Sequence, residues 1–252
     1  MNIFLVVLFM LFTTSSVQAS DLAKEKRWAE QTVDSILDGE DIWLKAGNLK
    51  FLSIYTEAED ESSKGIIVVH GTGIHPNWDQ VVKPVRVEMT MLGWNTLSVQ
   101  MPILANEATY DDYVPLYPEV PARLKAAEDY LLSQGIKNIV IVAHSQGSTM
   151  SAYYLANNDH KVSAFVAIGM QATQKDVDIN AATSLKAIDI PVLDLYGSKD
   201  LPGVLETVNK KKQASSHNKT YQQQVIMGAE HFFDDKNEEL IEAINNWLNQ
   251  LK

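Results

Sequence analysis

Continuous apolar runs that alternate with amphipathic segments constrain the fold of this chain more than any other feature. The runs GIIVVHG (65–71) and NIVIVAH (138–144) contain almost no polar residue, which is typical of strands covered on both faces. The segment NLKFLSIYTEA (48–58) instead alternates apolar and polar residues, as a half-buried edge strand does. We expect further strands at residues 94–101, 162–170, 191–197 and 221–229.

Helical patterns fill the intervals between these runs. They span residues 21–37, 78–92, 119–134, 146–157, 201–216 and 235–251. Strands that alternate with helices of this length predict βαβ units, so we expect an α/β fold with a mostly parallel central sheet flanked by helices. In such sheets ligands bind at the carboxyl ends of the strands.

Length and charge limit the domain organisation and the partners. At 252 residues, with no Gly/Ser/Pro-rich linker, charge block or internal repeat, the chain is expected to form a single domain over residues 20–252. Its net charge of −11 disfavours binding to nucleic acid and to anionic membrane surfaces. The basic run at residues 210–212 is interpreted as a solvated helix face.

The first 19 residues have the pattern of a signal peptide. An apolar stretch at residues 3–12 precedes Val17 and Ala19, which fit the small-residue cleavage pattern, so the mature chain is expected to start at Ser20. No Lys or Arg precedes the stretch, and a membrane anchor or a strand are the alternatives; ten apolar residues are short against the ~20 that span a bilayer. We therefore expect an exported protein, periplasmic or secreted, with no stable membrane span after cleavage. The chain has no cysteine and hence no disulfide.

Ser145 follows the apolar run at residues 138–144 and precedes a helical segment. A nucleophile elbow, G-x-S-x-G, needs a serine on a strained turn between a strand and a helix. Here Ala143 occupies the first small position, which adds one methyl group to the pattern, and Gly147 occupies the last. The alternative interpretation is a helix N-cap.

A glycine-rich loop follows the run at residues 65–71. Acyl transfer needs two backbone N–H groups that converge on an oxyanion, and glycine lets the backbone come close enough. We expect these donors to come from Gln146 and from Thr72, within a loop that includes Gly71. A dinucleotide fingerprint is excluded because Pro76 occupies its third glycine position. An ordinary turn is the remaining alternative.

Two aspartates near the strand at residues 191–197 are candidates for a catalytic acid. Asp200 lies in the loop beyond Gly197, where a carboxylate can reach a histidine. Asp194 lies in mid-strand and is expected to be held against a sheet face. We prefer Asp200; its alternative role is a helix N-cap.

Of the six histidines, His231 alone lies both after the acid and just past the last expected strand. Taken alone it has the alternative role of a packing residue. Asp234 and Asp235 lie close to it, but the sequence has neither a H-E-x-x-H motif nor a second histidine at ligand spacing, so no metal and no cofactor are expected.

Together the four motifs resemble the α/β-hydrolase fold, in which the triad has the chain order Ser, Asp/Glu, His. The resemblance covers roughly residues 40–252 and implies a triad of Ser145, Asp200 and His231. Within that superfamily, a closer likeness to a family of exported bacterial proteins catalogued as a domain of unknown function rests on four segments. These are HGTGIHPNW, LSVQMPIL, VLDLYGSKD and GAEHFF.

The resemblance implies a serine hydrolase, with a carboxylesterase or related acyl hydrolase that acts on a small-molecule ester as the favoured function. An amidase or peptidase with the same triad, and a non-catalytic binding protein, are the alternatives. The short interval between Met170 and Ile190 predicts that no large lid domain is present. Residues expected to line the substrate cleft are His75, Trp78, Tyr113 and Phe232.

Overall fold

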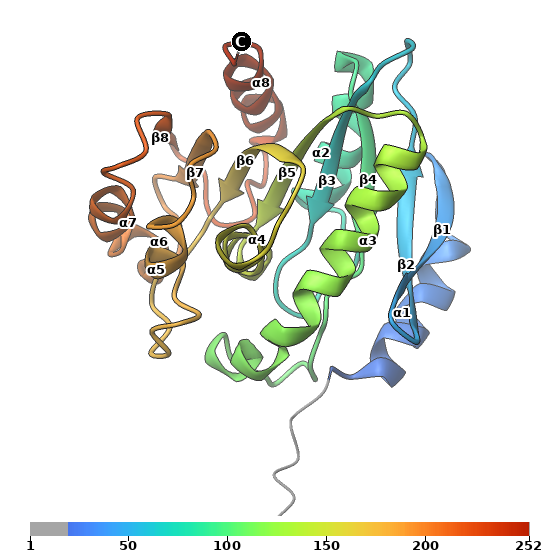
Figure 1. The fold of residues 1–252 in the computed structure, drawn as a ribbon, viewed down its shortest axis with the longest axis horizontal. Coiled ribbons are helices and arrows are strands. Elements are labelled where there is room, and N and C mark those ends of the chain that lie inside the picture. The colour runs from blue at the N-terminus through green and yellow to red at the C-terminus, as the bar shows by residue number, and fades with distance from the viewer. Residues whose placement is uncertain (1–19, 252) are drawn as a thin grey trace, which may run out of the picture.

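The computed structural model describes residues 20–251, in which an eight-stranded sheet is covered by helices (Figure 1). The predicted signal peptide, residues 1–19, lies outside the described residues. The strands are β1 (Glu40–Ala46), β2 (Leu49–Thr56), β3 (Lys64–Val69), β4 (Asn95–Val99), β5 (Asn138–His144), β6 (Val162–Ile168), β7 (Val192–Gly197) and β8 (Tyr221–Ile226). The α-helices are α1 (Leu22–Val33), α2 (Val82–Glu88), α3 (Val120–Ser133), α4 (Gln146–Asn157), α5 (Ala181–Leu185), α6 (Pro202–Leu205), α7 (Val208–Ala214) and α8 (Asn237–Leu248). Two 3₁₀ helices are η1 (Met89–Leu92) and η2 (Asp111–Glu119).

The strand order in the sheet is β1-β2-β4-β3-β5-β6-β7-β8. The pairs β1/β2 and β2/β4 are antiparallel, and the other neighbouring pairs are parallel. The predicted mostly parallel sheet is therefore confirmed. The interpretation of residues 48–58 as an edge strand is wrong, because β1 pairs along the outer side of β2 and leaves a run of four buried residues in it.

Alternate residues of the central strands pack into two separate apolar clusters, one on each face of the sheet. In β5, for example, Ile139, Ile141 and Ala143 belong to one cluster, whereas Val140 and Val142 belong to the other. Residues of α3, α4 and α5 complete the first cluster, and residues of α2 and α8 complete the second. Figure 1 shows α3 and α4 in front of the sheet and α8 behind it. This burial on both faces explains the continuous apolar runs in the sequence.

The connection between β6 and β7 contains one short helix, α5, so no large lid domain is inserted there. The segments that directly follow β3, β5, β6, β7 and β8 at the carboxyl edge of the sheet are loops and turns. Within residues 20–251, no helix is both long and apolar enough to cross a lipid bilayer.

A buried ion pair supports the β7 side of the sheet. Lys211 Nζ lies 2.8 Å from Asp194 Oδ1, and both side chains are completely buried. The other oxygen of Asp194 accepts hydrogen bonds from Tyr221 Oη at 2.8 Å and from Gln223 Nε2 at 3.0 Å. Both oxygens of Asp194 therefore have partners within the fold. This agrees with the prediction that a mid-strand carboxylate is held against a face of the sheet.

We expect Lys211→Met to lower the free energy of unfolding by about 3–5 kcal/mol, because it leaves a buried carboxylate without its counter-charge. Lys212→Met is the matched control, since Lys212 is the exposed neighbour, and its effect should stay within about 0.5 kcal/mol. Urea unfolding of both variants measures the difference. Equal stabilities would show that the buried pair does not hold this side of the sheet.

Candidate active site

Ser145 lies on the sharp turn between β5 and α4. Its backbone has φ 54° and ψ −123°, a region that is costly for any residue other than glycine, by about 1–3 kcal/mol. The backbone N–H of Ser145 donates to Ile168 O at 2.8 Å, which ties the turn to the end of β6. Ser145 occupies the N-cap position of α4, but its side chain makes no capping hydrogen bond to that helix.

Two glycines allow backbone segments to approach this turn. A Cβ at position 147 would lie 2.3 Å from His70 O, and a Cβ at position 71 would lie 2.9 Å from Ser145 Cβ. The first turn of α4 therefore rests directly on the end of β3, and the glycine-rich loop after β3 passes beside Ser145. Ala143 is the departure from the elbow pattern; its side chain is buried in the apolar cluster that includes α3 and α4.

His231 lies in the turns that follow β8 and faces Ser145. The distance from His231 Nε2 to Ser145 Oγ is 2.9 Å. Space for the imidazole depends on Gly169, where a Cβ would lie 2.9 Å from His231 Cε1. Gly197 allows the backbone before His231 to lie close to β7, because a Cβ there would lie 2.3 Å from Ala229 O. The structure thus brings the predicted nucleophile and base together at the carboxyl edge of the sheet.

Asp200 lies in the turn after β7 and contacts the other nitrogen of the same imidazole. His231 Nδ1 is 2.6 Å from Asp200 Oδ1, and the carboxylate also accepts from the N–H groups of Gly197 at 3.2 Å and Leu201 at 2.8 Å. Burial favours the neutral carboxyl, but the hydrogen bond and charge of His231 and the two N–H groups outweigh it and hold the pKa of Asp200 below its usual value. The N-cap of α6 is Leu201, not Asp200.

Two further histidines support this edge of the sheet as neutral groups. His70 Nδ1 lies 2.8 Å from Gly71 O, to which it donates, and His70 Nε2 accepts from the N–H of Met101 at 2.9 Å. His144 Nε2 donates to His231 O at 3.0 Å. Burial is the main cause that lowers the pKa of each to about 3. They therefore position the glycine-rich loop and the His231 turn without taking up protons.

The predicted oxyanion donors, Gln146 and Thr72, lie close to Ser145 in different ways. Gln146 directly follows Ser145 and begins α4, and the first N–H groups of a helix have no partner inside it. Thr72 lines the same cavity as Ser145. Within residues 20–251, neither backbone N–H donates to a backbone carbonyl.

A cavity of about 270 Å³ opens over Ser145 and His231. Besides these two, its lining residues are Gly71, Thr72, Ile74, Tyr110, His144, Gln171, Leu201 and Phe232. The predicted lining residue Phe232 is among them. Ile74, Gln171 and Leu201 were not predicted, although Leu201 directly follows Asp200. Tyr110 belongs to residues 106–121, a segment whose tyrosines are sequence-based candidates for the mouth of the cleft, with exposed turn residues as the alternative.

The other three predicted lining residues lie elsewhere. His75 and Trp78 pack against Trp28 of α1, with ring centroids 4.8 Å and 6.3 Å from it. Tyr113 is completely buried, and its hydroxyl accepts from the N–H of Leu104 at 3.1 Å. Their interpretation as cleft residues is therefore wrong for this cavity. His75 and Trp78 are covered by α1, and Tyr113 is buried in the core.

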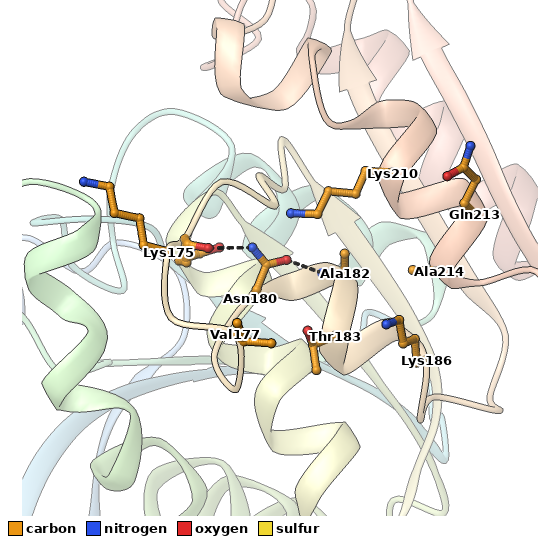
Figure 2. A pocket seen from close by; sticks show the side chains of 10 residues that line it. Lys175, Val177, Asn180, Ala182, Thr183, Lys186, Lys210, Gln213 and Ala214 are labelled. Atoms are coloured by element: carbon orange, nitrogen blue, oxygen red, sulfur yellow. Dashed lines mark hydrogen bonds between the residues drawn. The ribbon is translucent and has the colours of Figure 1, made fainter.

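A second, larger cavity of about 500 Å³ lies between residues 174–186 and α7 (Figure 2). Lys175, Lys186 and Lys210 are among its lining residues, and Figure 2 shows Asn180 hydrogen-bonded at its wall. No serine or histidine lines it. Ser145 and His231 line the smaller cavity, which is therefore the candidate active site.

The chain has the α/β-hydrolase fold, and Ser145, His231 and Asp200 meet at the carboxyl edge of its sheet. Among solved structures it is similar to the esterase Pf2001 of Pyrococcus furiosus, at 18% identity and a TM-score of 0.70, with 88% of this chain and 95% of that chain covered. It is also similar to Est1E from Butyrivibrio proteoclasticus, at 16% identity and a TM-score of 0.66 over 83% of this chain and 98% of that chain. An alpha-beta serine hydrolase homologue from Coxiella burnetii is 21% identical, with a TM-score of 0.66 over 86% and 99% of the two chains.

At the family level, the chain belongs to the family described as protein of unknown function DUF3530, which matches residues 13–115 and 111–250. None of the curated proteins matches it.

We expect Gly147→Ala to destabilise the fold by about 1–3 kcal/mol, because the added methyl group meets the backbone of β3. Helix propensity alone favours alanine over glycine by about 1 kcal/mol, so a net loss isolates the close approach. Chemical denaturation followed by circular dichroism measures the change. A gain in stability would contradict the contact between α4 and the end of β3.

Proposed function

We propose that this protein is a serine hydrolase, specifically a carboxylesterase or related acyl hydrolase that acts on small-molecule esters. The observation that carries the proposal is one continuous chain of hydrogen bonds. It runs from Ser145 Oγ to His231 Nε2 at 2.9 Å, and from His231 Nδ1 to Asp200 Oδ1 at 2.6 Å. A nucleophile, a base and a group that orients the base are the parts that acyl transfer through a serine ester needs.

In the proposed mechanism Ser145 Oγ attacks the ester carbonyl carbon while His231 Nε2 accepts the hydroxyl proton. His231 then donates that proton to the leaving alcohol as the C–O bond breaks, which leaves an acyl group on Ser145. Water attacks the acyl-enzyme with His231 again as base, and the acid product leaves. Asp200 accepts a hydrogen bond from Nδ1–H throughout and so keeps Nε2 in the form that accepts a proton.

The tetrahedral intermediates of both steps carry negative charge on the former carbonyl oxygen. In the proposal the N–H groups of Thr72 and Gln146 donate to it, and Gly71 allows the loop to lie close to Ser145. Each such donor contributes about 2.7–4 kcal/mol to transition-state stabilisation in known cases.

The size and lining of the cavity support a small substrate. Its volume of about 270 Å³ lies below the ~300–1,000 Å³ of pockets that hold drug-sized ligands. Ile74, Leu201 and Phe232 supply apolar surface, whereas Tyr110 and Gln171 supply polar groups. Burial raises the pKa of Tyr110 to about 12, so its hydroxyl stays neutral in a neutral solution.

An amidase or peptidase would use the same triad. The name of one similar solved structure favours ester hydrolysis over amide hydrolysis. Pf2001 of Pyrococcus furiosus is named an esterase. Comparing the turnover of an ester with that of the amide of the same acyl group separates the two functions. An amide hydrolysed as fast as its ester would replace the esterase proposal by the amidase.

We also propose that the protein is exported and that residues 1–19 are removed. This proposal rests on the apolar stretch at residues 3–12 and on the small residues Val17 and Ala19. The substrate would then be met in the periplasm or outside the cell.

We expect a fluorophosphonate probe to label the purified protein at Ser145, and Ser145→Ala to lose both the label and the hydrolysis of small activated esters. An activated serine is required for covalent capture of the probe, whereas a correctly folded binding protein would not react. Ser148→Ala is the matched control, since Ser148 lies in the same helix but donates to Ala143 O. A folded wild type that takes no label would favour the non-catalytic alternative.

We expect Asp200→Asn to lower kcat by several orders of magnitude with little change in melting temperature. The amide favours the wrong imidazole tautomer, a change that lowers kcat by about 10⁴ in the serine-protease template. Asp194→Asn is the matched control: it weakens the pair with Lys211, so it should lower stability much more than turnover. If Asp194→Asn were inactive and stable, the assignment of Asp200 as the catalytic acid would be wrong.

A further inference from the structure

Ser20, the residue that follows the expected cleavage site, is docked into the fold by Glu119. The backbone nitrogen of Ser20 donates to Glu119 Oε1 at 3.0 Å, and its hydroxyl donates to Glu119 Oε2 at 2.8 Å. Ser20 is 7% exposed. The next N–H, that of Asp21, donates to Ile103 O at 2.7 Å. Both oxygens of one carboxylate are therefore directed at a single residue near the start of the described chain.

Two carboxylates, those of Glu119 and Glu25, share one positively charged partner near Ser20. Arg123 Nη2 lies 3.6 Å from Glu119, but the same guanidinium makes two hydrogen bonds to Glu25, at 2.9 Å and 3.0 Å. Arg123 is thus the single cation within ion-pair distance of these two carboxylates in residues 20–251. Burial is the main cause that raises the pKa of Glu25, and the charge of Glu119 acts in the same direction. An amide N–H at Ser20 supplies a hydrogen bond but no charge.

We propose that hydrolysis of the Ala19–Ser20 peptide bond creates an α-ammonium group at Ser20 that forms an ion pair with Glu119, which ties the processed N-terminus to the end of η2, the helix that begins next to the cavity residue Tyr110. The reaction is ordinary peptide hydrolysis by a signal-type peptidase. The C–N bond breaks, the oxygen of water goes to the Ala19 carbonyl carbon, and Ser20 nitrogen becomes an amine. An α-amino group has a pKa of about 7.7–8.0, so the amine is largely protonated at neutral pH.

The pair would act on the wall of the catalytic cavity through η2. Glu119 is the last residue of η2, and Tyr110, which lines the cavity, directly precedes that helix. Tyr117 of the same helix accepts a hydrogen bond from Gln146 Nε2 at 2.9 Å. Ser20 is thus linked through Glu119 and η2 to the residue whose N–H is the proposed oxyanion donor.

The first test compares two chains that differ at their N-terminus. One begins at Ser20 with a free amine, and the other begins at Gln18 and so keeps an amide at Ser20 nitrogen. We expect the longer chain to melt about 2–4 °C lower, the shift that a loss of about 1 kcal/mol produces in a domain of this size. Equal melting temperatures would overturn the proposal, and this comparison needs no side-chain variant.

Glu119→Gln tests whether the difference in melting temperature comes from the ion pair or from the two added residues. In this background the two chains should melt at the same temperature, because the glutamine carries no charge; its oxygen can still accept from Ser20 nitrogen, and its NH2 group can donate to the Ser20 hydroxyl oxygen. Asp111→Asn is the matched control: it removes an exposed charge from the start of the same helix, and the difference should persist. A difference that also persists in Glu119→Gln would overturn the proposal.

The native processing site gives an independent outcome. The full-length chain is expressed with its own N-terminus, and the exported product is analysed by N-terminal sequencing. We expect the product to begin at Ser20. A product that begins at any other residue would overturn the proposal, whereas the assignment of Ser145, His231 and Asp200 would be unaffected.

Discussion

The close approach of α4 to the end of β3 is the contact on which the rest of the site depends. Because Gly147 has no Cβ, the first turn of α4 can rest on His70 O, and this contact sets the position of Ser145 relative to the loop at Gly71. The strained backbone of Ser145 is tolerated since β5, α4 and the end of β6 hold the residues around it. The backbone of Ser145 and Gln146 is thus positioned by the packing of α4 on the end of β3, while their side chains hydrogen-bond to His231 and Tyr117.

The same edge of the sheet holds three buried histidines, and their partners give them different roles. His70 and His144 contact backbone groups, and burial keeps both neutral. His231 alone of the three lies beside a carboxylate, that of Asp200, and beside a hydroxyl. Of the three, His231 is therefore the histidine whose two ring nitrogens face a carboxylate and a hydroxyl.

The strands, the direction of the sheet and the residues that meet at its carboxyl edge were predictable from the sequence, because continuous apolar runs mark buried strands and glycines mark their ends. Strand β1 was missed since its residues are mostly exposed, so its segment lacks the apolar run of a covered strand. The cavity lining was largely missed for a different reason. Whether a loop residue such as His75 faces a cavity or a neighbouring helix depends on tertiary packing, here against Trp28, which periodicity does not encode.

Five residues that line the cavity beside the proposed triad lie outside regular secondary structure. Ile74, Tyr110, Gln171, Leu201 and Phe232 follow the ends of five different strands, β3, β4, β6, β7 and β8. All of them except Ile74 also lie outside the two apolar clusters that cover the sheet. Substitutions at those four positions can therefore change the shape of the cavity while the packing of the sheet is retained.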